Sequence, residues 1–174
     1  MFTFAHSMQD IINKVDQSGL VQLDLEQLYG ADERCFIDIK EQLYMGLMLQ
    51  EKPFREFIKQ HDWSQYNNKL VAIGCSNDAI VPTWAYMLLA NKLSGIAKLL
   101  VFGGMSDLES LWYVKQIDAL DLSEFKDQKV VVKGCSHVPV PISAYVYLTN
   151  KLTPVVQSLM FGEPCSTVPL YKRK

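Results

Sequence analysis

The pattern of apolar and polar residues centres on two short apolar runs. Residues 70–73 (Leu-Val-Ala-Ile) and residues 130–132 (Val-Val-Val) contain no polar side chain. Short uninterrupted runs of this kind are typical of strands that are buried on both faces of a parallel sheet. A Gly-Cys-Ser sequence follows directly or after one residue, at 74–76 and 134–136. We therefore expect two buried strands, each ending in a glycine-containing loop.

A helix and a second strand are expected after each loop. Pro82 and Pro141 stand where helical patterns begin, a position at which the missing proline N–H costs nothing. The order strand–helix–strand in each half favours a parallel sheet with right-handed crossovers. The predicted helices cover residues 84–93 and 142–152, the predicted second strands cover 98–102 and 157–161, and an amphipathic segment at 107–120 joins the halves.

The two halves also repeat one another in sequence. The segment Lys69–Ser76 aligns with Lys129–Ser136 at an offset of 60 positions. From the prolines onward, Pro82–Gly103 aligns with Pro141–Gly162 at an offset of 59. Self-similarity at a fixed offset indicates that one supersecondary unit occurs twice. We interpret the pattern as an internal duplication over about residues 52–104 and 107–163.

These elements predict an α/β fold with a parallel-core sheet built from two tandem βαβ repeats. With the four core strands numbered in chain order, we expect the order 2-1-3-4 in one sheet, within a single domain over residues 1–174. An N-terminal extension over residues 1–50 is expected to be part helical and part strand. The pattern predicts helices at 8–17, 39–49 and 53–60 and an edge strand at 20–25.

Three cysteines follow predicted strands in similar short motifs. Cys75, Cys135 and Cys165 are each followed by serine, and the last two share Cys-Ser-x-Val-Pro. The carboxyl ends of parallel strands lie at one edge of a sheet, where α/β proteins bind ligands. In the order 2-1-3-4, the strands that carry these cysteines are neighbours about 4.8 Å apart. The sequence therefore predicts three sulfur atoms at one sheet edge.

Three thiols at one edge predict a metal centre. Thiolates select zinc, iron or iron–sulfur clusters over magnesium or calcium. His137, two residues after Cys135, is the expected fourth ligand. We therefore expect zinc or an iron–sulfur cluster, held by Cys75, Cys135, Cys165 and His137. The fourth cysteine, Cys35, lies outside the motif and is expected to pack in the core.

Two other functions are consistent with the same residues. In a metal-free thiol-dependent enzyme, Cys135 with His137 nearby would be the nucleophile, and another cysteine would resolve the intermediate. In a non-catalytic interaction protein, the cysteines would only fill core space, as buried cysteines commonly do. The metal content of the purified protein separates the first function from both of these.

Composition and charge exclude several classes of function. The chain is 49% apolar and 21% charged, which is ordinary for a globular domain and too apolar for disorder. Its 17 basic and 19 acidic residues give a net charge of −2, which argues against nucleic acid or an anionic membrane as the main partner. No apolar run approaches the ~18 residues of a membrane span. With four cysteines and no secretory pattern at residues 1–10, we expect a cytoplasmic protein with reduced thiols.

Four segments of the sequence carry a likeness to a known family, and the last is the most specific. They are residues 38–43, 54–58, 81–90 and 162–172. Through them the chain, from about Phe36 to its C-terminus, resembles a bacterial family known as domain of unknown function 2480. The resemblance implies no activity. It implies a link to sulfur mobilisation, so that iron–sulfur assembly proteins are the expected partners and an accessory role in holding, delivering or sensing a metal is the expected function.

Overall fold

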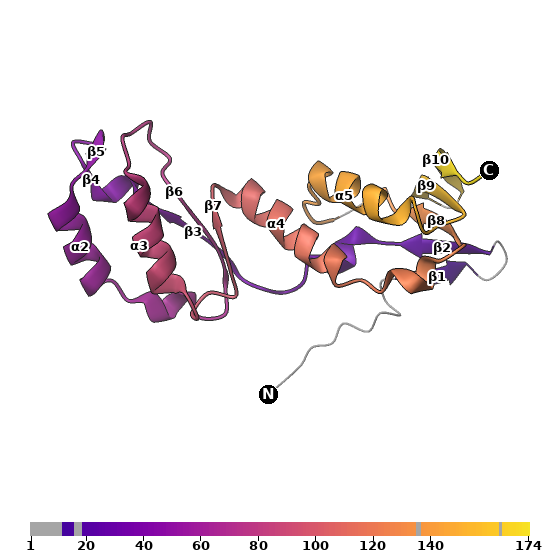
Figure 1. The fold of residues 1–174 in the computed structure, drawn as a ribbon, viewed down its shortest axis with the longest axis horizontal. Helices are drawn as coiled ribbons and strands as arrows, with labels where there is room; N and C mark the ends of the chain where they lie inside the picture. The colour runs from indigo at the N-terminus through magenta and orange to yellow at the C-terminus, as the bar shows by residue number, and fades with distance from the viewer. Residues whose placement is uncertain (1–11, 16–18, 135–136, 164) are drawn as a thin grey trace. The chain divides into compact units, whose positions relative to one another are not determined.

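The computed structural model describes residues 12–15, 19–134, 137–163 and 165–174. The described residues form two compact units, whose helices and strands are labelled in Figure 1. Unit 1 takes its residues from Met1–Gly30 and Tyr113–Lys174, and unit 2 is Ala31–Trp112. Each unit has a β-sheet of its own, so the chain forms a mixed α/β fold around two sheets.

The main sheet of unit 2 is parallel throughout and has the order β3-β6-β7. Its central strand is buried along its whole length, as the apolar run at 70–73 predicts. A helix, α3, joins β6 to β7, and α2 lies beside α3 (Figure 1). The elements of unit 2 are β3 (Arg34–Asp38), η2 (Ile39–Gln42), β4 (Leu43–Tyr44), β5 (Met48–Leu49), α2 (Glu51–Gln60), η3 (Trp63–Tyr66), β6 (Leu70–Gly74), α3 (Thr83–Leu93), β7 (Leu99–Phe102) and the first half of α4 (Met105–Asp118).

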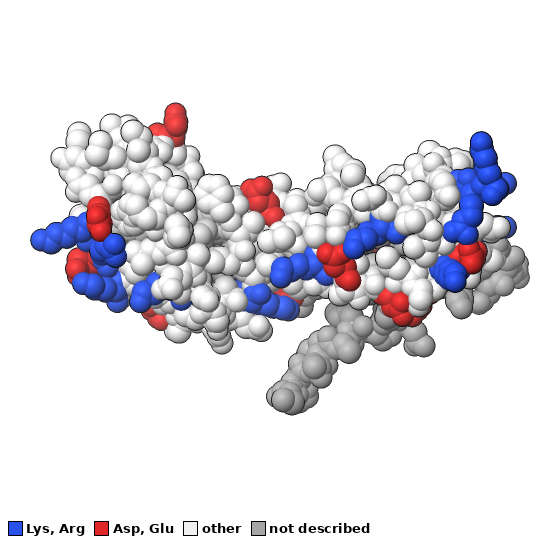
Figure 2. Space-filling view, in the orientation of Figure 1, with Lys and Arg blue, Asp and Glu red and all other residues white. Residues whose placement is uncertain are grey.

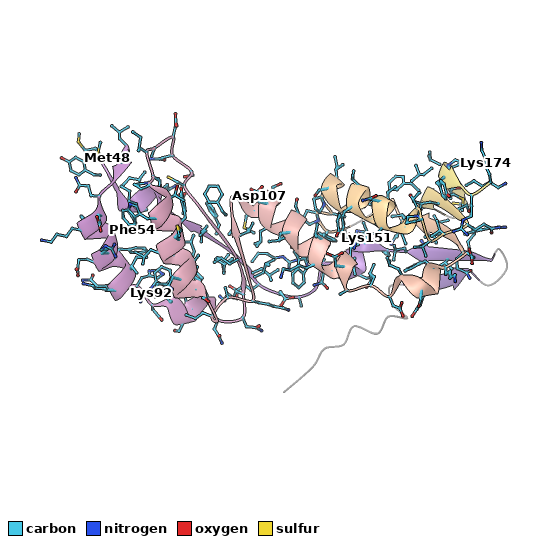
Figure 3. All side chains as sticks on the ribbon, in the orientation of Figure 1. Met48, Phe54, Lys92, Asp107, Lys151 and Lys174 are labelled. Carbon is cyan, nitrogen blue, oxygen red and sulfur yellow. The ribbon has the colours of Figure 1, made fainter. Side chains whose placement is uncertain are left out.

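The core of unit 2 lies between this sheet and the pair α2 and α3. Val71 and Ile73 of β6 share one face of the strand and join the buried cluster that includes Phe54 and Leu89. Figure 3 labels Phe54 on α2; its ring centroid lies 6.0 Å from that of Trp84 on α3. On the opposite face, Arg34 of β3 donates from Nε to the Glu109 carboxylate of α4 at 2.9 Å.

That bond places the first half of α4 against the second face of the sheet. Arg34 pairs in register with Leu70, so the two side chains share this face. Both faces of the β3-β6-β7 sheet are therefore covered, which explains why β6 reads as an uninterrupted apolar run.

The sheet of unit 1 has the order β1-β2-β8-β9-β10. Its three inner strands are parallel, and β1 and β10 run antiparallel at the two edges. The helix α5 joins β8 to β9, and its side chains at Ala144, Leu148 and Leu152 are fully buried. The elements of unit 1 are β1 (Ile12–Val15), β2 (Leu20–Leu23), η1 (Leu25–Leu28), η4 (Leu122–Phe125), β8 (Lys129–Val132), α5 (Ile142–Leu152), β9 (Ser158–Glu163) and β10 (Ser166–Lys172).

The two halves of the sequence repeat adopt the same succession of elements. η3, β6, α3 and β7 in unit 2 correspond to η4, β8, α5 and β9 in unit 1. Asp62 and Asp121 cap η3 and η4 in the same way, each accepting a hydrogen bond from the backbone N–H two residues later. Gly103 directly follows β7, and Gly162 is the penultimate residue of β9; their φ values are +129° and +125°, a backbone conformation that favours glycine.

The predicted order 2-1-3-4 in one sheet is wrong. β6 and β7 pair with each other and with β3, whereas β8 and β9 pair with each other and with β2. The physical reason is that each βαβ repeat takes its third parallel strand from the N-terminal fifth of the chain rather than from the other repeat. The expectation of a single domain over residues 1–174 stays a prediction.

The N-terminal extension also differs from its prediction. Residues 12–15 form strand β1 rather than part of a helix, and β2 lies inside the sheet rather than at its edge. Residues 39–49 form η2 and a short hairpin instead of a helix. The hairpin turns at Met45 and Gly46, which both have positive φ, 51° and 72°. The turn at Met45 and Gly46 is the reason that a continuous helix over 39–49 does not form. The helix predicted at 53–60 is confirmed as α2.

The surface carries charges of both signs. On the face in Figure 2, lysine and arginine side chains alternate with aspartate and glutamate on both units. In the described part of the chain, no helix has the length and apolar character that a membrane crossing requires.

Candidate functional site

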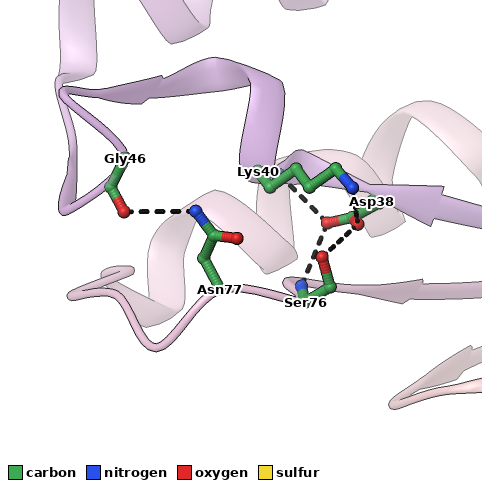
Figure 4. Close-up of polar contacts among 5 residues, drawn as sticks. All are labelled: Asp38, Lys40, Gly46, Ser76 and Asn77. Atoms are coloured by element: carbon green, nitrogen blue, oxygen red, sulfur yellow. Dashed lines mark hydrogen bonds and ion pairs between the residues drawn. The ribbon is translucent and has the colours of Figure 1, made fainter.

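The carboxyl edge of the unit 2 sheet holds a closed set of polar contacts around Asp38 (Figure 4). Asp38 ends β3 beside the loop that follows β6. Its carboxylate accepts hydrogen bonds from the Ser76 hydroxyl at 2.6 Å and from the Ser76 backbone N–H at 3.1 Å. It also accepts the N–H of Lys40 at 3.1 Å. Asn77 donates to the carbonyl of Gly46 at 3.3 Å, so the loop after β6 is tied to both β3 and the hairpin.

These contacts keep Asp38 ionised. Burial alone would raise the pKa of Asp38, but the hydrogen bonds from Ser76 and Lys40 outweigh it and hold this pKa below its ordinary value. The ammonium of Lys40, 3.7 Å from the carboxylate, acts in the same direction. The position of the Gly-Cys-Ser loop of unit 2 therefore depends on a charged Asp38.

Cys75 is half-buried in this loop and packs against the core cluster under α3. Tyr86 of α3 lies near it: burial raises the pKa of Tyr86, and the proximity of Cys75 and Asp38 raises it further. The Tyr86 ring packs edge-on against Phe102 with centroids 4.8 Å apart. This environment suits a cysteine that fills core space at the sheet edge.

The carboxyl edge of the unit 1 sheet is held by two acidic residues that follow β2. Lys133, just after β8, donates to the Asp24 carboxylate at 2.8 Å. The backbone N–H of His137 donates to the Glu26 carboxylate at 3.1 Å. The bond to Asp24 raises the pKa of Lys133 although burial would lower it, and nearby Glu26 and Glu163 raise it further. Lys133 and His137 are thus each bonded to an acidic residue that follows β2.

The exposed sulfur and imidazole of this edge contrast with the packed thiol of unit 2. Cys165, in the turn between β9 and β10, is exposed, and so is His137. Just before that turn, Oε1 of Glu163 is buried, and no described group forms a hydrogen bond with it. A buried carboxylate oxygen without a partner is rare in folded proteins, and an ion or an ordered water can satisfy it.

The predicted trio of cysteines is divided between the units. Cys75 belongs to unit 2, Cys165 and His137 belong to unit 1, and Cys135 lies outside the described residues. The reason for expecting all three to meet, one shared sheet, is wrong. Over residues 12–15, 19–134, 137–163 and 165–174, no group of three or more His, Cys, Asp or Glu side chains is placed to hold a metal ion. The assignment of Cys75, Cys135, Cys165 and His137 as ligands stays a prediction.

Sequence reasoning missed the acidic residues that shape both edges. Asp38, Asp24 and Glu26 anchor the loops after β6 and β8, and Glu163 brings an unpaired oxygen to the unit 1 edge. A signal was present for Asp38, because an aspartate directly before a predicted helix, here 39–49, is a typical cap. Asp24 fell inside the strand predicted at 20–25. The role of Glu163 depends on its burial, which no local pattern shows.

The comparisons with known proteins give a family but no function. A family model described as "Protein of unknown function (DUF2480)" matches residues 9–173. No curated protein matches the chain, and no solved structure matches it.

Proposed function

As the chain belongs to this family of proteins of unknown function, we propose its function from its own residues: binding of a zinc or iron ion, or of an iron–sulfur cluster, at the carboxyl edge of the unit 1 sheet. The proposed ligands are Cys135, His137 and Cys165, with Glu163 as an oxygen donor. Two thiolates, an imidazole and a carboxylate suit zinc or iron. The role is accessory: the protein holds or delivers the metal, and iron–sulfur assembly proteins are its proposed partners.

The pairing of β8 with β9 is the observation that carries this proposal. The two strands are parallel neighbours in register, so the segments that follow them leave the sheet at the same edge. A Cβ built on Gly134 would lie 3.4 Å from Cα of Gly162. Cys135 follows Gly134 directly in the sequence, and Cys165 comes three residues after Gly162. The proposed ligands therefore belong to two neighbouring loops of one unit.

The unpaired oxygen of Glu163 supports the same edge independently. Oε1 is buried without a hydrogen-bond partner among the described residues, which costs free energy unless a cation or water satisfies it. Lys133, a cationic neighbour of Glu163 on this edge, is already bonded to Asp24. A bound metal ion would supply the missing partner.

Cys75 is left out of the proposed site. It lies in the other unit, and it packs against the core cluster beside a loop whose polar groups are already paired with Asp38. Cys75 and Cys35 therefore serve as matched controls, because both are half-buried cysteines that pack against the unit 2 core.

Metal content tests the proposal directly. Protein purified without oxygen is expected to contain zinc, or iron with visible absorption. Cys135→Ser and Cys165→Ser should each remove the metal, and His137→Ala and Glu163→Gln should weaken its binding. Cys35→Ser and Cys75→Ser should leave the metal content unchanged. A protein without zinc or iron that also fails to bind either metal when it is supplied in the reduced state would rule the proposal out.

A metal-free thiol site is the second candidate, favoured by the exposure of Cys165. The Cys135 thiolate, its proton taken by His137, would attack one sulfur of a disulfide substrate and release one thiol. Cys165 would then displace the second thiol and leave a Cys135–Cys165 disulfide. Titration of free thiols after treatment with a small disulfide distinguishes the two candidates: loss of two thiols per chain, abolished by Cys165→Ser but not by Cys75→Ser, supports the thiol site. If neither metal binding nor disulfide formation occurs, the cysteines are structural.

A further inference from the structure

The two units differ at one equivalent sheet edge. In unit 1, the outer edge of β9 is covered by β10, which pairs with it antiparallel. In unit 2, β7 is the last strand of the main sheet, because the chain leaves Gly103 and enters α4 instead of turning back as a strand (Figure 1). In the described part of the chain, no strand pairs with the outer edge of β7.

The unpaired backbone groups of this edge belong to Leu100 and Phe102. Gly103 donates its N–H to Ile73 of β6, and backbone direction alternates along a strand, so the N–H and C=O of Leu100 and Phe102 point away from β6. The equivalent residues of β9 are Leu159 and Phe161, and they pair with Tyr171 and Val168 of β10. The same backbone positions are thus paired in one repeat and unpaired in the other.

Side-chain exposure follows the same difference. Phe161 is 36% exposed, whereas Phe102 is 65% exposed. Both rings pack edge-on against the equivalent tyrosine of the preceding helix, Tyr145 or Tyr86, so the ring contact does not account for the difference. Val168 of β10 lies opposite Phe161 in the sheet, whereas no described strand lies opposite Phe102 on the outer edge of β7.

The sequence of β7 offers none of the usual protection of a free edge. Strands at a sheet edge commonly carry a charge, a proline or a bulge that prevents pairing with another chain. β10 has Pro169 and an irregularity in its pairing between Pro169 and Tyr171. β3, the other edge of the unit 2 sheet, begins with Arg34 and ends with Asp38. β7 is Leu-Leu-Val-Phe, with no charge, proline or bulge.

We infer that β7 pairs antiparallel with β7 of a second copy of this chain, which closes the open edge with a two-fold symmetric contact. The two-fold axis of the dimer then passes between the two copies of Val101. Leu100 of each copy lies opposite Phe102 of the other. This register satisfies all the outward N–H and C=O groups of both residues with identical groups from the partner, as a two-fold interface requires.

Charge at the two ends of β7 fits this antiparallel register. Lys98 precedes the strand, and Asp107, labelled at the start of α4 in Figure 3, accepts the N–H of Gly104 just after it at 2.8 Å. Antiparallel pairing brings Lys98 of each copy opposite Gly104 of the other, next to the Asp107 carboxylate. Lys98 also forms an ion pair with Asp32 of its own chain. In the dimer, its ammonium would therefore lie near two carboxylates, Asp32 of its own chain and Asp107 of the other copy. The inference does not depend on the proposed metal site.

Amide hydrogen exchange of the full chain tests the contact, because unit 1 supplies an internal control. At millimolar concentration, the amides of Leu100 and Phe102 should exchange slowly, and at micromolar concentration they should exchange fast. The amides of Leu159 and Phe161, covered by β10 within the chain, should exchange slowly at both concentrations. Light scattering should show a dimer at the higher concentration. Equal exchange of Leu100 and Phe102 at both concentrations, or a monomer throughout, overturns the inference.

Two variants make the test specific to the edge. Phe102→Pro removes an N–H that does not pair with β6. Phe102→Lys keeps this N–H but places a charge in the contact. Either variant should raise the dissociation constant of the dimer at least tenfold. Met87→Ser, which removes another exposed apolar side chain of unit 2, should leave the dimer unchanged. A dimer that survives both Phe102 variants, or is lost in Met87→Ser alone, contradicts pairing through β7.

Discussion

Units 1 and 2 contain the same succession of strands and crossover helix in their interiors, and they differ at the edges of their sheets. In both, a capped helical turn leads into a buried parallel strand, a helix crosses over, and a glycine with positive φ stands next to the end of the second strand. Unit 1 adds antiparallel strands at both sides of its sheet, whereas unit 2 adds a hairpin and α2 and leaves β3 and β7 outermost. The repeated positions preserve backbone turns and core contacts, so the differences in function are to be sought at the loops and edges.

The largest effects should come from the equivalent core positions Leu89 and Leu148, both fully buried on the crossover helices. Leu89→Ala and Leu148→Ala should each lower the free energy of unfolding by about 2–5 kcal/mol, because each leaves a cavity in a packed core. Hydrogen exchange should show lost protection in unit 2 for the first variant and in unit 1 for the second. The exposed neighbours Met87→Ala and Val146→Ala are the controls, with changes within about 0.5 kcal/mol. Equal loss of protection in both units for either core variant would show that they unfold together.

Gly103, directly after β7, and Gly162, near the end of β9, should respond unequally to substitution by alanine. Both have φ near +125°, where an L-residue is strained, so each substitution should cost on the order of 1–3 kcal/mol. At Gly162 the new Cβ meets the backbone oxygen of Ser166 in β10, which can move only with the strand. At Gly103 it meets the side chain of Asp107, which can rotate. Urea denaturation should therefore show the larger loss for Gly162→Ala; a larger loss for Gly103→Ala would contradict the role given to β10.

Asp38 should make the unit 2 edge sensitive to acid. Its pKa is lowered in the folded protein, so its stabilising contribution is present above the ordinary value of 3.8 and is lost as pH falls through the lower, folded value. Asp38→Ala should cost about 1 kcal/mol at neutral pH, as the loss of a capping carboxylate does. The protection factor of the Ser76 amide, which compares its exchange rate with that of an unfolded chain at the same pH, should fall in acid in the natural protein and be low at all pH values in the variant.

Asp121→Ala is the matched control for Asp38→Ala. It removes the cap of η4 in unit 1 and should leave the Ser76 amide unaffected. A Ser76 amide that exchanges equally slowly with and without the Asp38 carboxylate would show that other contacts hold the loop.

The smallest effect should be a gain in stability at the hairpin of unit 2. Met45, with φ of 51°, is the first central residue of the turn that the Leu47 N–H closes on the Tyr44 carbonyl, and it is 77% exposed. Asparagine adopts this conformation more readily than methionine, so Met45→Asn should stabilise the protein by up to about 1 kcal/mol. Thermal unfolding of the two proteins measures the change. A loss of stability would show that Met45 makes contacts that its exposure does not indicate.

The sequence predicted what is local and repeated. The strands β6 and β8 and the helices α3 and α5 follow from patterns within each half, and the structure has these elements. The choice of strand partners was not predictable in the same way. β6 pairs with β3, and β8 pairs with β2. The sequence of an apolar strand does not specify which of several similar strands becomes its neighbour.

The candidate site shows the same limit. His137 and Cys165 were found from the Cys-Ser-x-Val-Pro motif and lie in one unit, but grouping them with Cys75 relied on the wrong sheet order. Glu163 gave no signal because its importance comes from the burial of one oxygen atom, which only the folded chain creates.

The division of the chain has a consequence for how the protein is made. Unit 2 is a continuous stretch, so its sheet can form as soon as residue 112 has left the ribosome. Unit 1 is split along the chain. The bond between Asp24 and Lys133 joins residues 109 positions apart. Strand β2 likewise has no parallel neighbour until β8 is synthesised. The inserted unit therefore has the opportunity to fold first and to shorten the effective loop that the outer unit must close.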